Sequence, residues 1–425
     1  MTLERLHIHV TGRVQGVGFR PTMYRYARER GLGGWVSNTS EGVIIEVEGE
    51  SELTTDFLNV LKTSPPPMAV IEGLEWIRIP ALCETAFEIR TSQTGTRAHT
   101  QISPDLALCS DCRRELQDPS NRRYRYPFIN CTNCGPRFTI IQGIPYDRPF
   151  TTMSGFTMCA LCRMEYENPM DRRFHAQPNA CPDCGPHVSL MTANGEILVE
   201  GDEAMRRAAE SLAKGHILAV KGLGGYHLAC DARSGDAVHI LRSRKRRWDK
   251  PFALMGRCIE DIRLVCEVAS EEEEMLRCAA SPVVLLKKRT DAGAERLADE
   301  IAPRNTSLGF MLPYTPLHTV LIEDGPSILV MTSGNYSQEP IAWRDGEARE
   351  YLSGIADFFL VHNRPIHTRC DDSVTRVIHS TGKEMMLRRS RGHSPSPLRS
   401  PFRIPAAILA CGGHFNNVFA LGRDD

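Results

Sequence analysis

Over residues 1–92, short stretches of alternating apolar and polar positions predict a compact α+β unit. LHIHVTGRV alternates with the period of two that is typical of a strand, and PTMYRYARERG has the early proline and final glycine of a helix. GGWVSN and EGVIIEVEGE follow as a turn and a hairpin strand. A second helix opened by Ser51 comes next, and then strands in EGLEWIRIP and TAFEIRTS. The resulting order, β-α-β-β-α-β, predicts a ferredoxin-like fold.

Residues 195–392 have a different pattern, in which apolar strand candidates alternate with helical stretches. DEAMRRAAESLAKG predicts an amphipathic helix that a glycine ends, and HILAVKGLGGYHLAC predicts a strand that runs into glycines. Further strand candidates are SPVVLLKK, PSILVMTSGN and ADFFLVHN. This alternation predicts a mixed α/β domain. Residues 393–425 form a linker rich in proline and serine and then two strand candidates around a glycine turn, and we expect them to begin a truncated C-terminal domain.

Between these two units, residues 93–190 show little periodicity and hold eight of the fifteen cysteines. The eight form four C-x-x-C pairs, and each cysteine of the first set recurs 50 positions later, as do neighbouring stretches such as NCTNCGPRF and ACPDCGPHV. The sequence therefore carries an internal duplication. The two sets are Cys109, Cys112, Cys131 and Cys134, and Cys159, Cys162, Cys181 and Cys184.

In each set the two C-x-x-C pairs are separated by 18 residues and can supply the four thiolates that zinc binds tetrahedrally. We therefore predict two structural zinc ions. A catalytic zinc is disfavoured because four thiolates leave no open position, and a thioredoxin-like redox pair would need a βαβ unit. We expect each repeat to close its own site, and exchange of pairs between repeats stays open as an alternative. His175 and His187 lie nearby in the sequence, and we interpret them as surface residues or as neighbours of the ligands.

The bulk composition narrows the class of protein further. With 425 residues the chain is long enough for several domains, and 41% hydrophobic and 24% charged residues are ordinary for a globular protein. The formal net charge of −1 provides no general attraction to nucleic acid or to an anionic membrane. The N-terminus lacks a signal-peptide pattern, and no apolar run is long enough to cross a bilayer. We therefore expect a cytoplasmic protein whose thiols stay reduced.

The stretch GRVQGVGFR, residues 12–20, has the composition of an anion-binding loop. Gly16 and Gly18 allow a tight backbone curl at the start of the predicted helix, and Arg20 can bind two oxygens of a phosphate. A tight strand-helix turn without a ligand is the alternative. Together with GGWVSNTSEGVIIEVEG, this stretch makes residues 5–91 resemble the acylphosphatase family. That resemblance implies that Asn38 orients the water that attacks an acyl or carbamoyl phosphate. It also implies that the phosphate is held by Arg20 and the loop Gln15, Gly16, Val17, Gly18 and Phe19.

The densest basic run is RSRKRRWDKP, residues 242–251. It fits a solvated helix face, a nucleic-acid patch or a site for nucleotide phosphates, and the near-zero net charge disfavours the nucleic-acid interpretation. With KGLGG (221–225), TSGN (332–335) and LRRSRG (387–392), it resembles the YrdC family, which forms carbamoyl-type adenylates from ATP. Trp248 departs from the proline that this family often has there. The resemblance implies that the nucleotide is held by Lys245, Arg247, Lys250, Ser333, Asn335 and Arg388.

The order of the units, an acylphosphatase-like unit, a doubled zinc module and a YrdC-like domain, resembles the HypF family of hydrogenase maturation carbamoyltransferases. The resemblance implies that carbamoyl phosphate is hydrolysed to carbamate, which ATP with Mg²⁺ converts to carbamoyl-AMP. It also implies a final domain that transfers the carbamoyl group to the C-terminal cysteine of the partner HypE. Three alternatives stay open: a threonylcarbamoyl-AMP synthase-like enzyme of tRNA modification, a non-enzymatic zinc adaptor, and an acylphosphatase fused without coupling. We expect neither a membrane nor a nucleic-acid partner.

Overall fold

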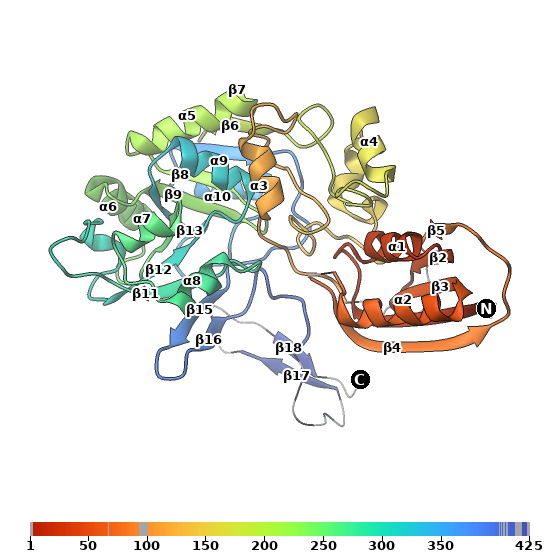
Figure 1. Cartoon of the computed structure of the whole chain (residues 1–425). Helices are drawn as coiled ribbons and strands as arrows, with labels where there is room; N and C mark the ends of the chain where they lie inside the picture. Colours follow the sequence, from red (N-terminus) through yellow and green to blue (C-terminus); the bar gives the residue numbers. More distant parts are fainter. Residues whose placement is uncertain are drawn as a thin grey trace.

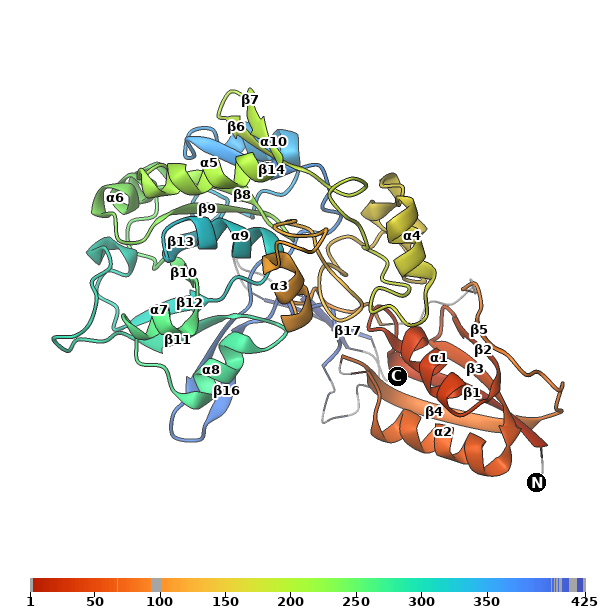
Figure 2. The ribbon, with the colours of Figure 1, turned by 45° about the horizontal axis from the view of Figure 1, so that its top comes forward.

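A computed structural model of the chain describes residues 3–66, 68–92, 101–398, 400, 402, 404, 407–412 and 419–422. The N-terminal unit lies at one end of the molecule and the large α/β domain at the other, with the cysteine-rich segment between them (Figure 1). The view of Figure 2 agrees, since it places α4 of the cysteine-rich segment beside α1 of the N-terminal unit. The expected three-part division of the fold is therefore confirmed.

The N-terminal unit is a five-stranded sheet in the order β4-β1-β3-β2-β5, with two helices on one face. Alternate side chains of β1 and β3 point toward these helices, so that Ile8 and Ile45 pack against Phe57 of α2 in one apolar cluster. The predicted order β-α-β-β-α-β is confirmed, but GGWVSN, expected as a turn, is a strand, β2, because it pairs along its whole length with β3. The strand expected in TAFEIRTS is the short β5, which adds to the edge of β2. The elements are β1 (Leu3–Arg13), α1 (Phe19–Glu29), β2 (Gly33–Asn38), β3 (Val43–Glu50), α2 (Ser51–Thr63), β4 (Val70–Ile79) and β5 (Phe87–Ile89).

The cysteine-rich segment consists mostly of turns, as its weak periodicity predicts. In both repeats a short helix begins at the residue after the first cysteine, at Ser110 and at Ala160. Tyr126, Phe128 and Ile129 of this segment belong to the same apolar cluster as the core of the large domain. The segment is therefore packed onto the large domain. Its elements are α3 (Ser110–Gln117), η1 (Arg148–Phe150), η2 (Thr152–Gly155) and α4 (Ala160–Glu167).

The large domain is built on an eleven-stranded mixed sheet in the order β16-β15-β11-β12-β10-β13-β9-β8-β14-β6-β7. Helices α5 and α9 cover one face together with the cysteine-rich segment, and α6, α7, α8 and α10 cover the other. The side chains of Ser234 and Thr315 cap α6 and α9, which fixes where these helices begin. The domain boundary drawn from the sequence at residue 190 falls inside β6, which pairs with β14 in this sheet. The elements are β6 (Val188–Thr192), β7 (Ile197–Glu200), α5 (Gly201–Ala213), β8 (Leu218–Lys221), β9 (Tyr226–Asp231), α6 (Gly235–Arg244), β10 (Ala253–Gly256), α7 (Ile259–Arg263), α8 (Ser270–Arg277), β11 (Val283–Lys287), η3 (Asp299–Ile301), β12 (Ser307–Met311), α9 (Pro316–Asp324), β13 (Ile328–Ser333), α10 (Asp345–Leu352), β14 (Phe358–His362), β15 (Val374–Ile378) and β16 (Lys383–Arg388).

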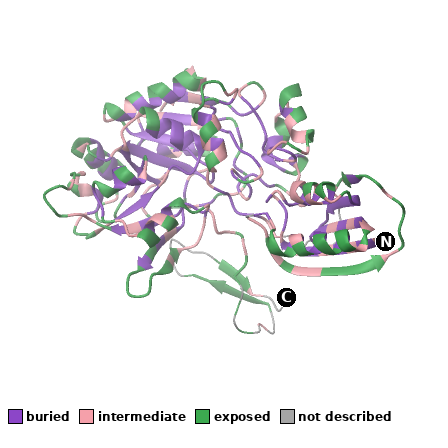
Figure 3. Cartoon of the chain, in the orientation of Figure 1, coloured by how far each residue is buried: buried purple, intermediate pink, exposed green. Residues whose placement is uncertain are grey.

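The two strands predicted near the C-terminus form an antiparallel hairpin of β17 (Ile408–Cys411) and β18 (Phe419–Gly422). The turn expected between them lies outside the described residues. Figure 3 shows that the hairpin is exposed, whereas buried residues gather in the large sheet and in the loops beside the N-terminal unit. Within the described part of the chain, none of the helices has the length and apolar character that a membrane span requires.

Candidate active sites and metal centres

The loop between β1 and α1 has the geometry that its glycines predict. Gly16 and Gly18 have φ angles of 71° and 73°, in the left-handed region that glycine tolerates best. Gly18 is also the residue before the first turn of α1, so the loop ends at the positive end of a helix. A β-carbon at Gly18 would lie 3.2 Å from the side chain of Thr132, which leaves little room for a larger residue. The structure therefore forms a backbone cradle suited to an anion.

Arg20 and Asn38 line one pocket together with this loop. The Arg20 guanidinium is buried and donates from Nη2 to Asp147 Oδ1 at 2.8 Å and from Nη1 to Ser92 Oγ at 3.2 Å. The Asn38 side chain is 1% exposed, and its Oδ1 has no hydrogen-bond partner among the described residues. A buried amide oxygen without a partner is costly, so the site is suited to a water or substrate donor. Arg20 and Asn38 of the sequence prediction thus lie at one pocket, whereas nothing in the sequence pointed to Asp147.

The other wall of this pocket, which we call the phosphate pocket after the sequence prediction, comes from the cysteine-rich segment. Arg137 donates from Nε to the carbonyl oxygen of Gly16 at 2.7 Å, and the amide of Tyr146 donates to Gln15 Oε1 at 3.3 Å. His175 also lines the pocket, so the expectation that it lies at the surface or beside the ligands is wrong; the backbone of this repeat turns it toward the N-terminal unit. Burial and the charge of Arg20 lower the pKa of His175 to about 4, so this ring is neutral at pH 7. His187 is exposed, as expected.

The eight cysteines form two groups of four. In each group the sulfur atoms lie within 4.8 Å of one another, and each group comes from a single repeat. The expectation that each repeat closes its own site is confirmed, and exchange of pairs between repeats is wrong. Four converging thiol groups fit a tetrahedral structural zinc ion. The groups are Cys109, Cys112, Cys131 and Cys134, and Cys159, Cys162, Cys181 and Cys184.

An arginine of each repeat donates a hydrogen bond to a cysteine of the other repeat. Arg122 of the first repeat donates to Cys162 Sγ at 3.2 Å, and Arg172, 50 positions later, donates to Cys112 Sγ at 3.1 Å. A zinc ion with four thiolates carries a net negative charge, which a guanidinium next to a sulfur stabilises. The duplication seen in the sequence is therefore also a reciprocal contact in space.

The next arginine in each repeat, Arg123 or Arg173, also contacts the other repeat, by donating to a carboxylate. Arg123 donates to Glu165 of the second repeat at 2.5 Å, and Arg173 donates to Glu115 of the first repeat. Both arginines are buried. The Arg-Arg pair is seen to recur in the sequence. That the arginines of one repeat bind residues of the other repeat depends on how the two repeats pack together.

In the large domain, Lys245 lies at the end of α6 and is buried. Its Nζ donates to the carbonyl oxygens of Ser333 and Asn335 at 2.6 and 2.5 Å and to Asn335 Oδ1 at 2.6 Å. Burial, with a smaller effect of the Arg247 charge, lowers the pKa of Lys245 to about 7. All three ammonium hydrogens are thus used to hold the segment after β13. The structure brings together the Lys245, Ser333 and Asn335 of the sequence prediction.

Arg247 and Arg388 lie near this segment and influence each other. Burial lowers the pKa of Arg247 to about 10, and the charges of Arg242 and Arg388 contribute to that fall. Arg388 Nη1 lies 3.6 Å from Asp371 Oδ2. The Lys250 side chain is exposed, and its carbonyl oxygen accepts hydrogen bonds from Arg242 and Arg247. The basic run is therefore neither an entirely solvated helix face nor a uniform patch, because its members differ in burial and partners.

Two further buried networks adjoin the expected nucleotide residues, and no local pattern marks them. His227, opposite Ser333 in the sheet register, lies with Nε2 3.0 Å from Asp372 Oδ2, and Arg391 Nε donates to the other oxygen of this carboxylate, Oδ1, at 2.9 Å. Lys221 of the KGLGG stretch donates to Asp345 at 2.8 Å. These partners are more than 100 residues apart in the sequence, and only the folded sheet brings them together.

Three family models match successive parts of the chain: acylphosphatase over residues 6–89, the HypF finger over 108–141 and 158–191, and telomere recombination over 210–390. The chain is also 47% identical over 423 residues to the carbamoyltransferase HypF of Synechocystis sp., which covers 100% of this chain and 54% of that protein. The chain belongs to the HypF family. Its closed cysteine groups, its phosphate loop and its large mixed sheet are therefore features of a HypF-type molecule.

Other HypF proteins show the same likeness. The probable carbamoyltransferase HypF of Methanocaldococcus jannaschii is 43% identical over 99% of this chain and 54% of that protein. A full-length HypF in its phosphate- and nucleotide-bound form has a TM-score of 0.91 at 43% identity, over 100% of this chain and 56% of that one. The HypF of T. kodakarensis has a TM-score of 0.90 at 44% identity, over 99% of this chain and 53% of that one. The chain thus spans about half the length of the HypF proteins it matches.

Proposed function

We propose that this chain carries out two steps of a carbamoyl transfer. Carbamoyl phosphate is hydrolysed at the phosphate loop, and the carbamate formed is adenylated with ATP in the large domain. The observation that carries the proposal is the phosphate pocket, where Arg20, the glycine loop and Asn38 converge under a wall from the cysteine-rich segment. Within the described residues, Asn38 Oδ1 has no hydrogen-bond partner there. The likeness to a HypF structure that holds both phosphate and nucleotide supports the pairing of the two steps.

At the phosphate pocket, the backbone of Gly16 to Gly18 and the Arg20 guanidinium bind the phosphoryl oxygens. Asn38 Oδ1 accepts a hydrogen bond from the attacking water and so directs its oxygen at phosphorus. The bond between phosphorus and the carbamoyl oxygen then breaks, and carbamate leaves with the electron pair. Because an acyl phosphate is already activated, positioning and charge stabilisation suffice. Asp147 and Ser92 hold Arg20 in place for this step.

In the large domain, a carboxylate oxygen of carbamate attacks the α-phosphorus of ATP, and pyrophosphate leaves. Mg²⁺ enters with ATP as part of the substrate and offsets the phosphate charge. Arg247, Arg388 and the exposed Lys250 supply positive charge to the phosphates. Lys245 has a different task from the one the resemblance implies, because its hydrogen bonds to Ser333 and Asn335 position the segment that binds the adenylate.

The two zinc ions that we propose for the cysteine groups serve the structure and not the reaction. Four thiolates occupy each ion fully, so that substrate has no open position. Their contribution is to give the turns of residues 101–187 a fixed shape. That shape matters because this segment both lines the phosphate pocket and packs on the large sheet.

We further propose that carbamate passes from one site to the other inside the molecule, since it is short-lived in water. Transfer of the carbamoyl group to the C-terminal cysteine of HypE is assigned to the part of the family's length that this chain does not span. We place the reaction in the cytoplasm, where the cysteine groups stay reduced for zinc.

The test supplies carbamoyl phosphate and ATP and follows the release of phosphate and of pyrophosphate. We expect Arg20→Ala to abolish both releases while ATP binding stays intact, and Asn38→Ala to slow phosphate release by about 100-fold. Retained pyrophosphate release in Arg20→Ala would show that the two activities are merely fused. Pyrophosphate release that requires threonine and bicarbonate would indicate a threonylcarbamoyl-AMP synthase, and no release of either product would indicate an adaptor.

A further inference from the structure

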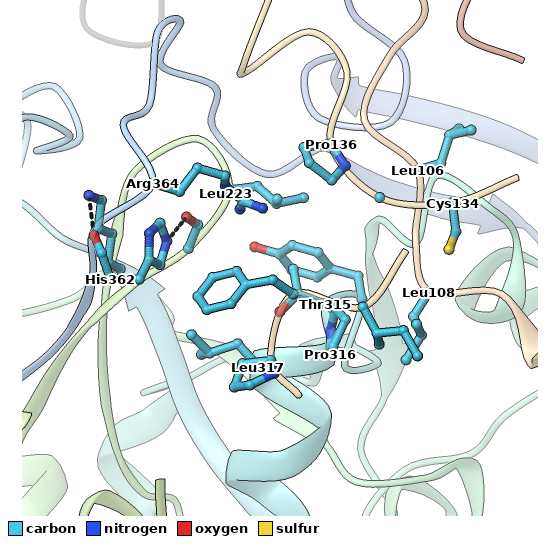
Figure 4. A pocket seen from close by; sticks show the side chains of 17 residues that line it. Leu106, Leu108, Cys134, Pro136, Leu223, Thr315, Pro316, Leu317, His362 and Arg364 are labelled. Carbon is cyan, nitrogen blue, oxygen red and sulfur yellow. Dashed lines mark hydrogen bonds between the residues drawn. The ribbon is translucent and has the colours of Figure 1, made fainter. Parts of the chain in front are cut away.

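A cavity lies between the cysteine-rich segment and the large sheet (Figure 4). Most of its lining is apolar and includes Leu106, Phe128 and Pro136 from the cysteine-rich segment and Leu223 and Leu317 from the large domain. Such a lining has few polar groups that could compete with a ligand for hydrogen bonds. Its low dielectric constant also strengthens the attraction between charges inside the cavity.

Arg364, which follows β14, points its side chain into this cavity between His362 and Pro136 (Figure 4). Its side chain is 6% exposed, and the guanidinium forms no hydrogen bond or ion pair within the described part of the chain. The guanidinium does lie over the ring of Phe128, in a cation–π contact with 5.3 Å between the guanidinium carbon and the ring centre. Burial lowers the pKa of Arg364 to about 10, so it keeps its positive charge at pH 7.

The other buried arginines behave differently. Throughout the described residues, each of them donates to carbonyl or carboxylate oxygens; Arg391, for example, donates to Asp372 and to two carbonyl oxygens. Lys221, the other cation in the cavity wall, is paired with Asp345. The carboxyl of Asp105 lies close enough to influence Arg364, but burial raises its pKa and weakens it as a counter-ion. A buried cation without a partner is costly, so the cavity favours an anion.

The position of the cavity suggests which anion. Residues 131–137 line both pockets, with Thr132 and Arg137 at the phosphate pocket and Cys134 and Pro136 at the cavity. The opposite wall includes the turn between β8 and β9, and β9 then carries His227 opposite Ser333. The cavity therefore lies between the proposed site of hydrolysis and the proposed site of adenylation.

We propose that Arg364 binds a small planar carboxylate-type anion in this cavity, namely the carbamate in transit between the two sites. The inference rests on the proposed function, which it deepens by naming a residue on the route. The planar fork of a guanidinium matches a carboxylate with two parallel hydrogen bonds. The apolar walls keep water from the anion, which limits protonation of its nitrogen and loss of carbon dioxide.

The first experiment measures pyrophosphate and phosphate release together, from carbamoyl phosphate and ATP, in Arg364→Gln. We expect the pyrophosphate formed per phosphate to fall at least tenfold and to recover in part in Arg364→Lys, which restores the charge without the planar fork. The matched control is Arg113→Gln, which removes another partly buried guanidinium at the same interface. Arg113 donates to the carbonyl oxygen of Pro313 and does not line this cavity. An unchanged ratio in Arg364→Gln, with zinc content and unfolding temperature like those of the parent chain, overturns the proposal.

The second experiment does not depend on turnover. Crystals of the parent chain and of Arg364→Gln are soaked in bicarbonate, a planar probe with the carboxylate of carbamate. Density for the anion within hydrogen-bonding distance of Arg364 in the parent alone supports the proposal, and an empty cavity overturns it. If the parent chain releases no phosphate but binds bicarbonate at Arg364, the proposed function fails while the anion site stands.

Discussion

Replacing Glu165 with glutamine tests whether the hydrogen bonds from arginines of one cysteine repeat to a carboxylate of the other stabilise the protein. The Glu165 carboxylate accepts from Arg122 at 2.7 Å and from Arg123 at 2.5 Å, and the Arg123 side chain is 1% exposed. The change keeps the size of the side chain and removes its charge. It leaves a buried guanidinium that can no longer pair with an anion.

The size of the effect follows from the titration of this carboxylate. Burial raises the pKa of Glu165, but hydrogen bonds from Arg123 and Arg122 and the charges of Arg123 and Arg173 outweigh burial and lower the pKa from 4.5 to about 2. That fall corresponds to about 3 kcal/mol in favour of the ionised form in the folded state. Because 20% of the side chain stays exposed to solvent, we expect a loss of about 2 kcal/mol at pH 7.

The assay is denaturant unfolding of the zinc-loaded chain at fixed zinc concentration. Glu167→Gln is the control, since Glu167 lies on the same helix but is 64% exposed and 4.0 Å from Arg163. The control should lose less than about 0.5 kcal/mol. Because the pKa is lowered, the advantage of the parent chain is present above pH 4.5 and should shrink as the pH falls toward 2. Equal unfolding free energies for the two variants at pH 7 would refute the reasoning.

Three further outcomes are expected. Because burial and the charge of Arg20 lower the pKa of His175 to about 4, the unfolded chain binds a proton at this residue at a higher pH than the folded chain does. The free energy of unfolding should therefore fall as the pH drops from 6.5 to 4, and less so in His175→Gln; equal pH dependence in both would contradict this. The pKa of Lys245, lowered to about 7 by burial, should make the KM for ATP rise between pH 6.5 and 8.5, and kinetics of Lys245→Met should show a flat profile. Cys181→Ser should reduce the zinc content, measured by atomic absorption, from about two ions per chain to about one; loss of both ions would mean that the groups are not independent.

Much of the architecture could be predicted because its signals are local. The alternation in residues 1–92 determines which side chains of β1 and β3 face the helices, and this predicted the β-α-β-β-α-β unit correctly. The glycines at 16 and 18 have the left-handed backbone that the loop needs. The spacing of the cysteines set which sulfurs could meet, because a C-x-x-C pair places both ligands within one turn.

The sites themselves depended on contacts between units that are distant in the sequence. Asp147 reaches Arg20 across 127 residues, and Lys221 reaches Asp345 across 124. His175 was misplaced because its neighbours in the sequence are metal ligands, whereas its neighbours in space belong to the phosphate pocket. Lys245 is the expected cationic residue, but its own segment does not reveal that the carbonyl oxygens of Ser333 and Asn335 accept its hydrogens.

The sequence by itself thus determined the elements, the metal-binding residues and the cradle for an anion, because period, spacing and glycine content act over a few residues. The tertiary structure decided how the cysteine-rich segment closes the phosphate pocket and how each repeat places an arginine at the cysteines of the other. It also decided where Arg364 lies, which has no partner among the described residues. The physical reason is that these features depend on the docking of surfaces from separate units. That docking is set by shape and burial over the whole interface, and no short stretch of sequence records it.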